Sequence, residues 1–364
     1  MLIAPASGAI VTACHEEQQE NFSWHASLDP ENQAIAYDWI LALDSTLSNI
    51  VLTLNTDSDT ILVLSGQTMI SLFQGTSDTV VSYYWAVSAS DGEMMTQSNV
   101  HAITFVSEIA KTYTLPTTFP AGFTPPHDKL TGATLTGWGG NQGCLIHHPI
   151  VFIHGNGGTA NDWNAIGNKL LQEGYSPKEL WALSYIDFAG GDSASSNMAN
   201  IAEINDFVST VMDYTGVQKI DIIAYSLGVT VVRAWVKEYD AYDKVAHLIA
   251  IAGANHGVNF CSGPNATMSL CLEIGHPNSE FLTSLNTPDE TPRDDIVTYM
   301  TIYDGTGADL FYPAFAVFND GSTGNLLESP KLDGALNVQL AGKDHLQLKD
   351  SEESFTAMLD FLRQ

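Results

Sequence analysis

Residues 221–230 read D-I-I-A-Y-S-L-G-V-T, an apolar run followed by Ser226 and then by a helix-like segment. A sharp turn from a strand into a helix pushes a serine hydroxyl clear of the sheet, and it needs small neighbours because the two backbones approach closely. Gly228 provides one small neighbour, whereas Ala224 stands in place of the first glycine of G-x-S-x-G. The motif alone therefore leaves two alternatives open, a nucleophile elbow or an ordinary strand-turn-helix.

The sequence around this motif, from residue 149 onward, alternates buried-type strands with amphipathic helices. The strand-like segments include P-I-V-F-I-H-G, E-L-W-A-L-S-Y, K-I-D-I-I-A-Y-S and K-V-A-H-L-I-A-I-A-G, and helix-periodic segments separate them. Such alternation predicts an α/β fold with a mostly parallel central sheet and helices on both of its faces. Functional groups are then expected at the carboxyl ends of the strands, and Ser226 lies at such an end.

Residues 1–108 have a different rhythm, with short alternating or β-branched runs separated by turn signals such as D-P-E-N and S-D-G-E. Closely spaced strands without helical periodicity predict an all-β, immunoglobulin-like sandwich with Trp24 and Trp85 in its core. The early F-S-W and the later Y-Y-W-A-V-S-A-S-D-G resemble fibronectin type III-like modules. Repeated Pro and Gly predict a linker over residues 109–148, which leads into a catalytic domain at residues 149–364.

The composition excludes several classes of partner. The chain of 364 residues has 13 Lys and Arg against 42 Asp and Glu, a formal net charge of -29. Such a charge repels nucleic acid and anionic membrane surfaces, and no apolar stretch is long enough to cross a bilayer. Cys261 and Cys271 are placed to close a loop rich in Gly, Pro and Asn, whereas Cys14 and Cys144 fit a bond or two separate thiols equally well. We expect a secreted protein whose signal peptide has been removed.

A serine nucleophile requires a base, because an alcohol attacks poorly at neutral pH unless its proton is removed. Among the 11 histidines, His345 combines a position after the last strand with the chain order serine, acid, histidine. The acid is expected on the loop Y-D-G-T-G-A-D-L, which offers Asp304 and Asp309, and position alone does not decide between them. A buried carboxylate there would hold the imidazole tautomer and stabilise the imidazolium that forms.

A tetrahedral oxyanion needs backbone N–H donors. The candidates are Leu227, which follows the serine, and Asn156, which lies in the loop H-G-N-G-G. A glycine-rich loop after a strand also fits phosphate, but the chain has neither G-K-[ST] nor G-x-G-x-x-G with a downstream ribose-binding acid, which argues against nucleotide binding. We expect no cofactor, and the pair His147-His148 is too little to predict a metal site.

Residues 149–364 resemble the class 2 lipases, small bacterial α/β-hydrolases that also use A-x-S-x-G. The matching segments are P-I-V-F-I-H-G-N-G-G, G-Y-S-P-K-E-L-W-A-L-S-Y, K-I-D-I-I-A-Y-S-L-G, I-A-G-A-N-H-G and L-D-G-A-L-N-V-Q-L-A-G-K-D-H, in this order. The resemblance implies an α/β-hydrolase fold with Ser226 as nucleophile and His345 as base. It also implies that Asn156 and Leu227 are the oxyanion donors.

Further positions follow from this resemblance or depart from it. The acid of the family falls best on Asp309, and an extra residue or two in this stretch keeps Asp304 as the alternative. Tyr225 stands where the family usually has His, which is expected to change packing or the polarity of the substrate entrance. Phe281 and Leu282 lie in a long loop that also resembles extracellular polyester depolymerases, and they are candidates for a substrate-binding rim or for anchors of the loop to the core.

The predicted function is hydrolysis of a carboxylic ester through an acyl-enzyme, by a lipase or esterase acting on a soluble ester or at a lipid surface. An extracellular polyester hydrolase is a narrower alternative, in which the sandwich domain would dock onto an insoluble polymer rather than serve as a spacer. A non-catalytic adhesion or binding protein on a hydrolase scaffold is a third alternative, and it requires that triad members be missing. The sequence specifies neither acyl-chain length nor oligomeric state.

Overall fold

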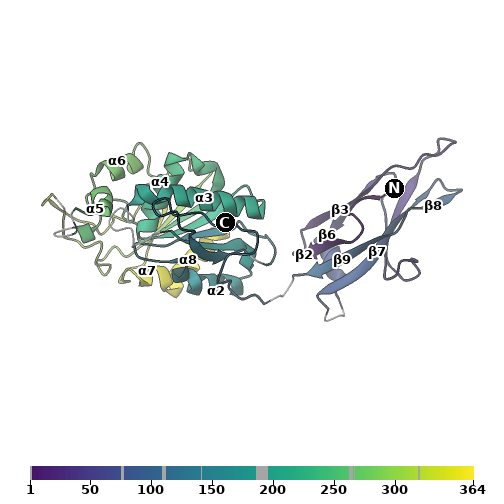
Figure 1. Ribbon diagram of the computed structural model, residues 1–364, viewed down its shortest axis with the longest axis horizontal. Coiled ribbons are helices and arrows are strands. Elements are labelled where there is room, and N and C mark those ends of the chain that lie inside the picture. Colours follow the sequence, from purple (N-terminus) through teal and green to yellow (C-terminus); the bar gives the residue numbers. More distant parts are fainter. Residues whose placement is uncertain are drawn as a thin grey trace. The chain divides into compact units, whose positions relative to one another are not determined.

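The computed structural model describes residues 2–74, 78–108, 112–140, 142–185, 196–261, 265, 267–318 and 320–364. The chain divides into two compact units, Met1–Thr112 and Tyr113–Gln364 (Figure 1). The helices are α1 Gly66–Ser71, α2 Asn164–Gln172, α3 Asn197–Thr215, α4 Leu227–Glu238, α5 Ser269–Ile274, α6 Glu280–Asn286, α7 Gln347–Asp350 and α8 Glu352–Leu362. Among the described residues, none of the helices combines the length and the apolar character that crossing a membrane requires.

The strands of the first unit are β1 Leu2–Ala4, β2 Ala9–Ala13, β3 Gln19–Trp24, β4 Ala36–Ala42, β5 Ile50–Asn55, β6 Ile61–Ser65, β7 Val80–Ser90, β8 Met95–Gln97 and β9 His101–Ser107. The strands of the second unit are β10 Thr136–Gly139, β11 Ile150–Ile153, β12 Leu180–Ser184, β13 Ile220–Tyr225, β14 Val245–Ile251, β15 Thr298–Tyr303, β16 Ala316–Val317, β17 Thr323–Gly324 and β18 Leu336–Gln339.

The first unit is built from strands, with the short helix α1 between β6 and β7. In its described residues the strands form two sheets, ordered β1-β3-β6 and β2-β9-β7-β4-β5, with β8 paired to β7. Phe22 of β3 packs against Trp39 and Trp85 of the other sheet, at ring-centroid distances of 4.9 and 5.1 Å. Trp24 and Trp85 are both buried, as predicted. The two sheets therefore share one core, which confirms an all-β sandwich, while the likeness to fibronectin type III modules stays a prediction.

The second unit is built on one mixed sheet, which in the described residues has the order β10-β12-β11-β13-β14-β15-β18. Its neighbouring strands are parallel except for β10 and β12 at one edge. Helices α3 and α4 cover one face of this sheet, and α2, α7 and α8 cover the other (Figure 1). The inner strands are buried on both faces, and β11 reads I-V-F-I without an exposed residue. This is the α/β-hydrolase fold, so the predicted fold class is confirmed.

The described residues from Tyr113 to His148 lie in the second unit, although the sequence predicts a linker over 109–148. Strand β10 pairs antiparallel with β12, and the Trp138 side chain is buried, with its ring N–H donating to the Ala160 carbonyl oxygen at 2.9 Å. The segment T-G-W-G has two glycines and no alternation, so its sequence indicates a turn rather than a strand. Residues 109–111, at the start of the predicted linker, lie outside the described residues.

Candidate active site

Ser226 lies between the carboxyl end of β13 and the first residue of α4. Its φ is +54°, in the left-handed region that residues other than glycine rarely adopt. Such strain persists only where the surrounding structure holds it, and it is typical of a nucleophile elbow. Ala224 is fully buried in β13, where it lies opposite Ile153 and Ala250 of the neighbouring strands. The alanine of A-Y-S-L-G is therefore compatible with the sharp turn.

Two glycines allow the backbones to approach each other at this turn. A Cβ atom on Gly228 would lie 2.5 Å from the carbonyl oxygen of His154. A Cβ atom on Gly155 would lie 2.9 Å from the Cβ of Ser226. Neither position accepts a larger residue without a shift of the backbone, so the loop H-G-N-G-G and the start of α4 require glycine at these two points.

His345 follows β18 and contacts both of its predicted partners. Its Nε2 lies 2.9 Å from the Oγ of Ser226, and its Nδ1 lies 2.7 Å from the Oδ2 of Asp309. The Asp309 carboxylate is 1% exposed, and its other oxygen accepts the N–H of Phe311 at 3.0 Å. At these distances the carboxylate, the imidazole and the hydroxyl are joined by a continuous chain of hydrogen bonds. Such a chain can move a proton from the serine to the histidine.

Asp304, the alternative acid, is also buried but is bound by the backbone of two loops. Its carboxylate accepts backbone N–H groups at distances of 2.6–2.9 Å. The donors are Thr306, Gly307, Ala308 and Gly342. Burial raises the pKa of the Asp304 carboxyl, but the hydrogen bond from the Thr306 hydroxyl at 2.6 Å and the backbone hydrogen bonds outweigh burial and leave the pKa below its ordinary value. Since Gly342 lies just before His345, Asp304 fastens the loop of the histidine to the loop of Asp309.

Tyr225 contacts the same histidine through both its hydroxyl and its ring. Its hydroxyl donates to the carbonyl oxygen of His345 at 3.1 Å, and the two rings lie 5.0 Å apart. Burial raises the pKa of the Tyr225 hydroxyl above its ordinary value, which keeps the group protonated as a donor. The sequence predicted an effect on packing or entrance polarity, and the structure places Tyr225 both against the histidine loop and on the cavity wall.

A cavity of about 180 Å³ opens beside the serine hydroxyl. Its lining near Ser226 includes Asn156 and Leu227, the two predicted oxyanion donors. The rest of the wall is largely apolar, and it includes Val258, Phe260, Leu270, Ile274, Phe311 and Tyr312. None of these six wall residues was predicted from the sequence. Leu270 and Ile274 carried a weak signal, because residues four apart share one face of a helix.

Phe281 and Leu282, the predicted rim residues, lie on α6. Leu282 is fully buried and belongs to the core of the second unit, and Phe281 is half-buried against that core. Neither is among the described residues that line the cavity. The structure thus agrees with the alternative that these residues anchor the long loop. The same loop is closed by a disulfide between Cys261 and Cys271.

His154 supports the glycine-rich loop from within the core, where it is fully buried. The Tyr185 N–H donates to its Nε2 at 3.3 Å, so the Nδ1 carries the proton and donates to the Gly155 carbonyl oxygen at 2.8 Å. Burial lowers the pKa of His154 to about 4. The neutral ring therefore makes both of its hydrogen bonds. A second proton, on Nε2, would face the Tyr185 N–H and break the hydrogen bond that this N–H donates.

Side chains of the kinds that can ligate a metal ion gather at the other end of the sheet. Among the described residues, His148, Asp221 and His247 form such a group, and all three lie at or near the amino ends of strands. Ser226 lies at the carboxyl end, so this group is separate from the cavity.

Comparisons with known proteins found one matching family model and several similar proteins. The model of the class 2 lipase family matches residues 147–309. A 2-succinyl-6-hydroxy-2,4-cyclohexadiene-1-carboxylate synthase from Klebsiella pneumoniae is 28% identical over 130 residues, which are 35% of this chain and 38% of that protein. The chain thus matches well under half of the length of this relative.

Two solved structures are also similar. Bacillus licheniformis lipase BlEst2 in its mature form is 16% identical, over 62% of this chain and 96% of that one, with a TM-score of 0.45. Aspergillus fumigatus lipase B is 16% identical, over 60% of this chain and 53% of that one, with a TM-score of 0.44. The family match contains Ser226 and Asp309. It supports assignment of the second unit to the lipase- and esterase-type α/β hydrolases.

Proposed function

We propose that this protein is a serine carboxylic-ester hydrolase, with Ser226 as nucleophile, His345 as general base and Asp309 as the acid that orients the base. The observation that carries the proposal is the chain of hydrogen bonds from Asp309 through His345 to Ser226. It ends on a strained serine beside a largely apolar cavity. Candidate residues for each component of acyl transfer thus lie at or next to this cavity.

The reaction follows from the positions of these groups. The Oγ of Ser226 attacks the ester carbonyl carbon while the Nε2 of His345 takes the hydroxyl proton. The N–H groups of Asn156 and Leu227 hold the oxyanion of the tetrahedral intermediate. The protonated His345 then donates to the leaving alcohol, and an acyl-enzyme remains. A water molecule, deprotonated by the same imidazole, attacks this ester and releases the carboxylic acid.

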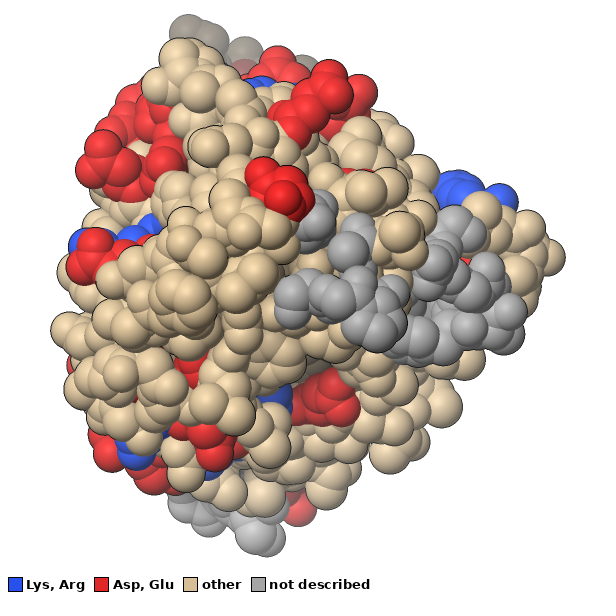
Figure 2. All heavy atoms as spheres, turned by 90° about the vertical axis from the view of Figure 1, so that its left-hand side faces the viewer, with Lys and Arg blue, Asp and Glu red and all other residues tan. Residues whose placement is uncertain are grey.

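The substrate is proposed to carry an apolar acyl group, because the cavity wall is largely apolar. Exposed apolar side chains also follow two of the site residues in the chain, Leu310 after Asp309 and Leu346 after His345. Figure 2 shows the end of the molecule that carries α5, where uncharged residues cover most of the surface and the acidic residues form separate groups. A surface of this kind is compatible with an uncharged, apolar ester.

Secretion remains part of the proposal, and the disulfide between Cys261 and Cys271 supports it, because such bonds persist in oxidising compartments.

Docking of the first unit onto a polymer has less support. The exposed large apolar residues of its described part are aliphatic or methionine, such as Leu28, Met94 and Met95, with no aromatic among them. The non-catalytic alternative requires that triad members be missing, and it is not favoured, since every role in acyl transfer has a candidate residue.

The test uses the full chain and p-nitrophenyl esters of increasing acyl length, with emulsified lipid and polyester film as further substrates. We expect Ser226→Ala to lower kcat by about 10⁶-fold. The exposed Ser284 offers a matched control, and Ser284→Ala is expected to keep the wild-type rate. A fluorophosphonate probe should label Ser226 in the wild type, as located by peptide mass spectrometry. Undiminished turnover by Ser226→Ala would contradict the proposal.

A further inference from the structure

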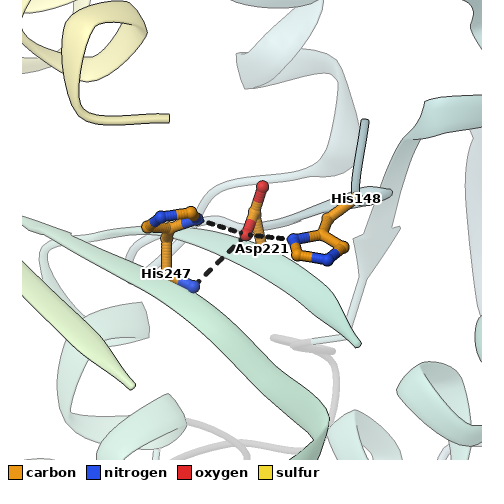
Figure 3. A group of neighbouring side chains, drawn as sticks. All are labelled: His148, Asp221 and His247. Carbon is orange, nitrogen blue, oxygen red and sulfur yellow. Dashed lines mark hydrogen bonds and ion pairs between the residues drawn. The ribbon is translucent and has the colours of Figure 1, made fainter. Parts of the chain in front are cut away.

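Three side chains that the proposed reaction does not use meet at the amino ends of three adjacent parallel strands. His148 lies two residues before β11, Asp221 is the second residue of β13, and His247 is the third residue of β14. Strand β13 lies between β11 and β14 in the sheet. Figure 3 shows the two imidazole rings on either side of the Asp221 carboxylate, to which both direct a nitrogen.

One nitrogen or oxygen atom from each of these three residues lies close to the other two. The Oδ1 of Asp221 lies 2.8 Å from the Nδ1 of His247 and 3.6 Å from the Nδ1 of His148. One ligand atom from each of the three residues lies within 4.8 Å of the other two. Asp221 is buried and 2% exposed, His247 is half-buried and His148 is exposed. A buried carboxylate thus faces two imidazoles, with access from solvent on the His148 side.

The backbone holds this arrangement in place. The register of β13 against β14 shifts at Asp221, because Ile220 pairs with Val245 whereas Ile222 pairs with Leu248. An irregularity of this kind re-aims side chains, and here it sets His247 against the carboxylate. The backbone N–H of His247 also donates to the Asp221 Oδ1 at 3.2 Å. A ligating carboxylate that accepts such a hydrogen bond is oriented for a metal ion.

We propose that His148, Asp221 and His247 bind a divalent transition-metal ion of the Zn²⁺ class. Two imidazole nitrogens and one carboxylate oxygen are ligands that Zn²⁺ accepts, whereas Ca²⁺ and Mg²⁺ prefer oxygen alone. Ligand atoms around tetrahedral Zn²⁺ lie about 3.3 Å apart, so the observed spacings require only small side-chain rotations. A water molecule completes the four ligands. The Nδ1 of His247 must be free of its proton to bind the metal, so a neutral ring carries its proton on Nε2 instead, and a doubly protonated ring releases one proton to solvent.

The site is structural rather than catalytic. Asp221 and Ser226 belong to the same stretch of extended chain and lie five residues apart, a separation of about 16 Å along the strand. A metal ion at Asp221 is thus too far away to polarise an ester held at Ser226. It instead links β11, β13 and β14 at the ends opposite the cavity, and it stabilises the folded state because the unfolded chain lacks the site.

The test is isothermal titration of the full-length chain, without a histidine tag and stripped with a chelator, with ZnCl₂. We expect one Zn²⁺ per chain, and His148→Ala is expected to weaken the affinity at least tenfold. Because His148 is exposed, this variant keeps the fold, which circular dichroism verifies. The matched control is His147→Ala, because the Nδ1 of His147 lies 3.4 Å from Glu179 instead of Asp221. MgCl₂ and CaCl₂ are expected to bind at least a hundredfold more weakly than ZnCl₂.

A second measurement follows the melting temperature. Zn²⁺ at about 100 times its Kd is expected to raise the Tm of the wild type by roughly 5–10 °C, and to leave that of His148→Ala unchanged. No binding to the wild type, or equal Zn²⁺ affinities in the wild type and His148→Ala, would overturn the proposal. Asp221 would then only form ion pairs with the two histidines. Ester hydrolysis is expected to survive the chelator, so a failure here is distinguishable from a failure of the proposed function.

Discussion

The two ends of the central sheet carry the same kinds of side chain in different orders. At the carboxyl ends of the strands, the imidazole of His345 lies between a carboxylate and a hydroxyl. At the amino ends, the carboxylate of Asp221 lies between the imidazoles of His148 and His247. An imidazole in the middle can pass a proton between its two partners, whereas a carboxylate in the middle offers converging ligand atoms. The order of the groups therefore decides the chemistry.

The surroundings of the two clusters also differ, and the difference agrees with the chemistry assigned to each. The carboxyl end has a strained serine and a cavity of about 180 Å³ beside it. The cluster at the amino end is centred on Asp221 of β13, where the register against β14 shifts, and its residues do not line that cavity. A substrate thus has room beside Ser226, whereas the other cluster fits an ion. Substitutions at the carboxyl end test which of its groups serve the reaction and which serve the fold.

The largest effect is expected for Asp309→Asn. The amide keeps the size of the side chain but cannot accept the Nδ1–H of His345 in the same way, which favours the wrong imidazole tautomer. We expect kcat to fall by about 10⁴-fold, with little change in the free energy of unfolding. Steady-state hydrolysis of a p-nitrophenyl ester and urea unfolding measure the two quantities. The exposed Asp360 on α8 provides the control Asp360→Asn, and a similar rate loss in both variants would contradict this assignment.

The next effect is expected for Asp304→Asn and is of a different kind. The substitution places an amide NH₂ among backbone donors that now share a charged acceptor. We expect the free energy of unfolding to fall by about 3–5 kcal/mol, while kcat per folded molecule falls less than about tenfold. Urea unfolding and active-site titration separate these two results. A 10⁴-fold loss of kcat without loss of stability would instead make Asp304 the acid.

These two aspartates show why the sequence left the acid open. Both follow β15 on one loop, and both are buried, so neither position nor hydrophobicity separates them. What separates them is the partner that each carboxylate meets, which depends on how the loops after β15 and β18 fold together. The resemblance to class 2 lipases favoured Asp309, because it carries information about that tertiary arrangement. Ser226 and His345 were easier to predict, since both combine a required residue type with a strand end.

The sheet and its helices were predictable because buried parallel strands have continuous apolar runs. Strand β10 was not, since T-G-W-G owes its conformation to pairing with β12 rather than to its own residues. The buried face of α6 could not be predicted from the sequence either, because a helix as short as Glu280–Asn286 has too few positions to show a periodic apolar pattern. The pair His147-His148 gave no metal prediction, because its partners Asp221 and His247 are distant in the chain and become neighbours only through the strand order.

His154, which follows the carboxyl end of β11, belongs to neither cluster and gives a pH-dependent prediction. The pKa of His154 is about 4 in the folded chain against an ordinary 6.5, because burial disfavours its charged form. Between these values the unfolded chain binds a proton that the folded chain does not, so stability falls as pH decreases. The difference corresponds to about 3 kcal/mol by pH 4. Urea unfolding between pH 7 and pH 4 measures this loss.

The control for this prediction is His154→Gln, whose carbonyl oxygen can still accept the Tyr185 N–H. We expect the variant to be less stable at pH 7 but to lose less stability than the wild type as the pH decreases to 4. Parallel pH profiles for the two proteins would show that another group is responsible. The distinction between a neutral, structural His154 and His345 as the proposed base would then lose its support.

The smallest effect is expected for Tyr225→Phe, and it tests how firmly the histidine must be held. The substitution removes the hydroxyl that donates to the His345 carbonyl oxygen but keeps the ring that lies against the imidazole. A single neutral hydrogen bond contributes about 1 kcal/mol, so we expect kcat to fall about threefold to tenfold. KM should change little for short acyl chains, since the removed group acts on the base. The exposed Tyr239 offers the control Tyr239→Phe. A rise in KM at constant kcat would instead place Tyr225 in substrate binding, and the order of groups around His345 would then suffice without support from this tyrosine.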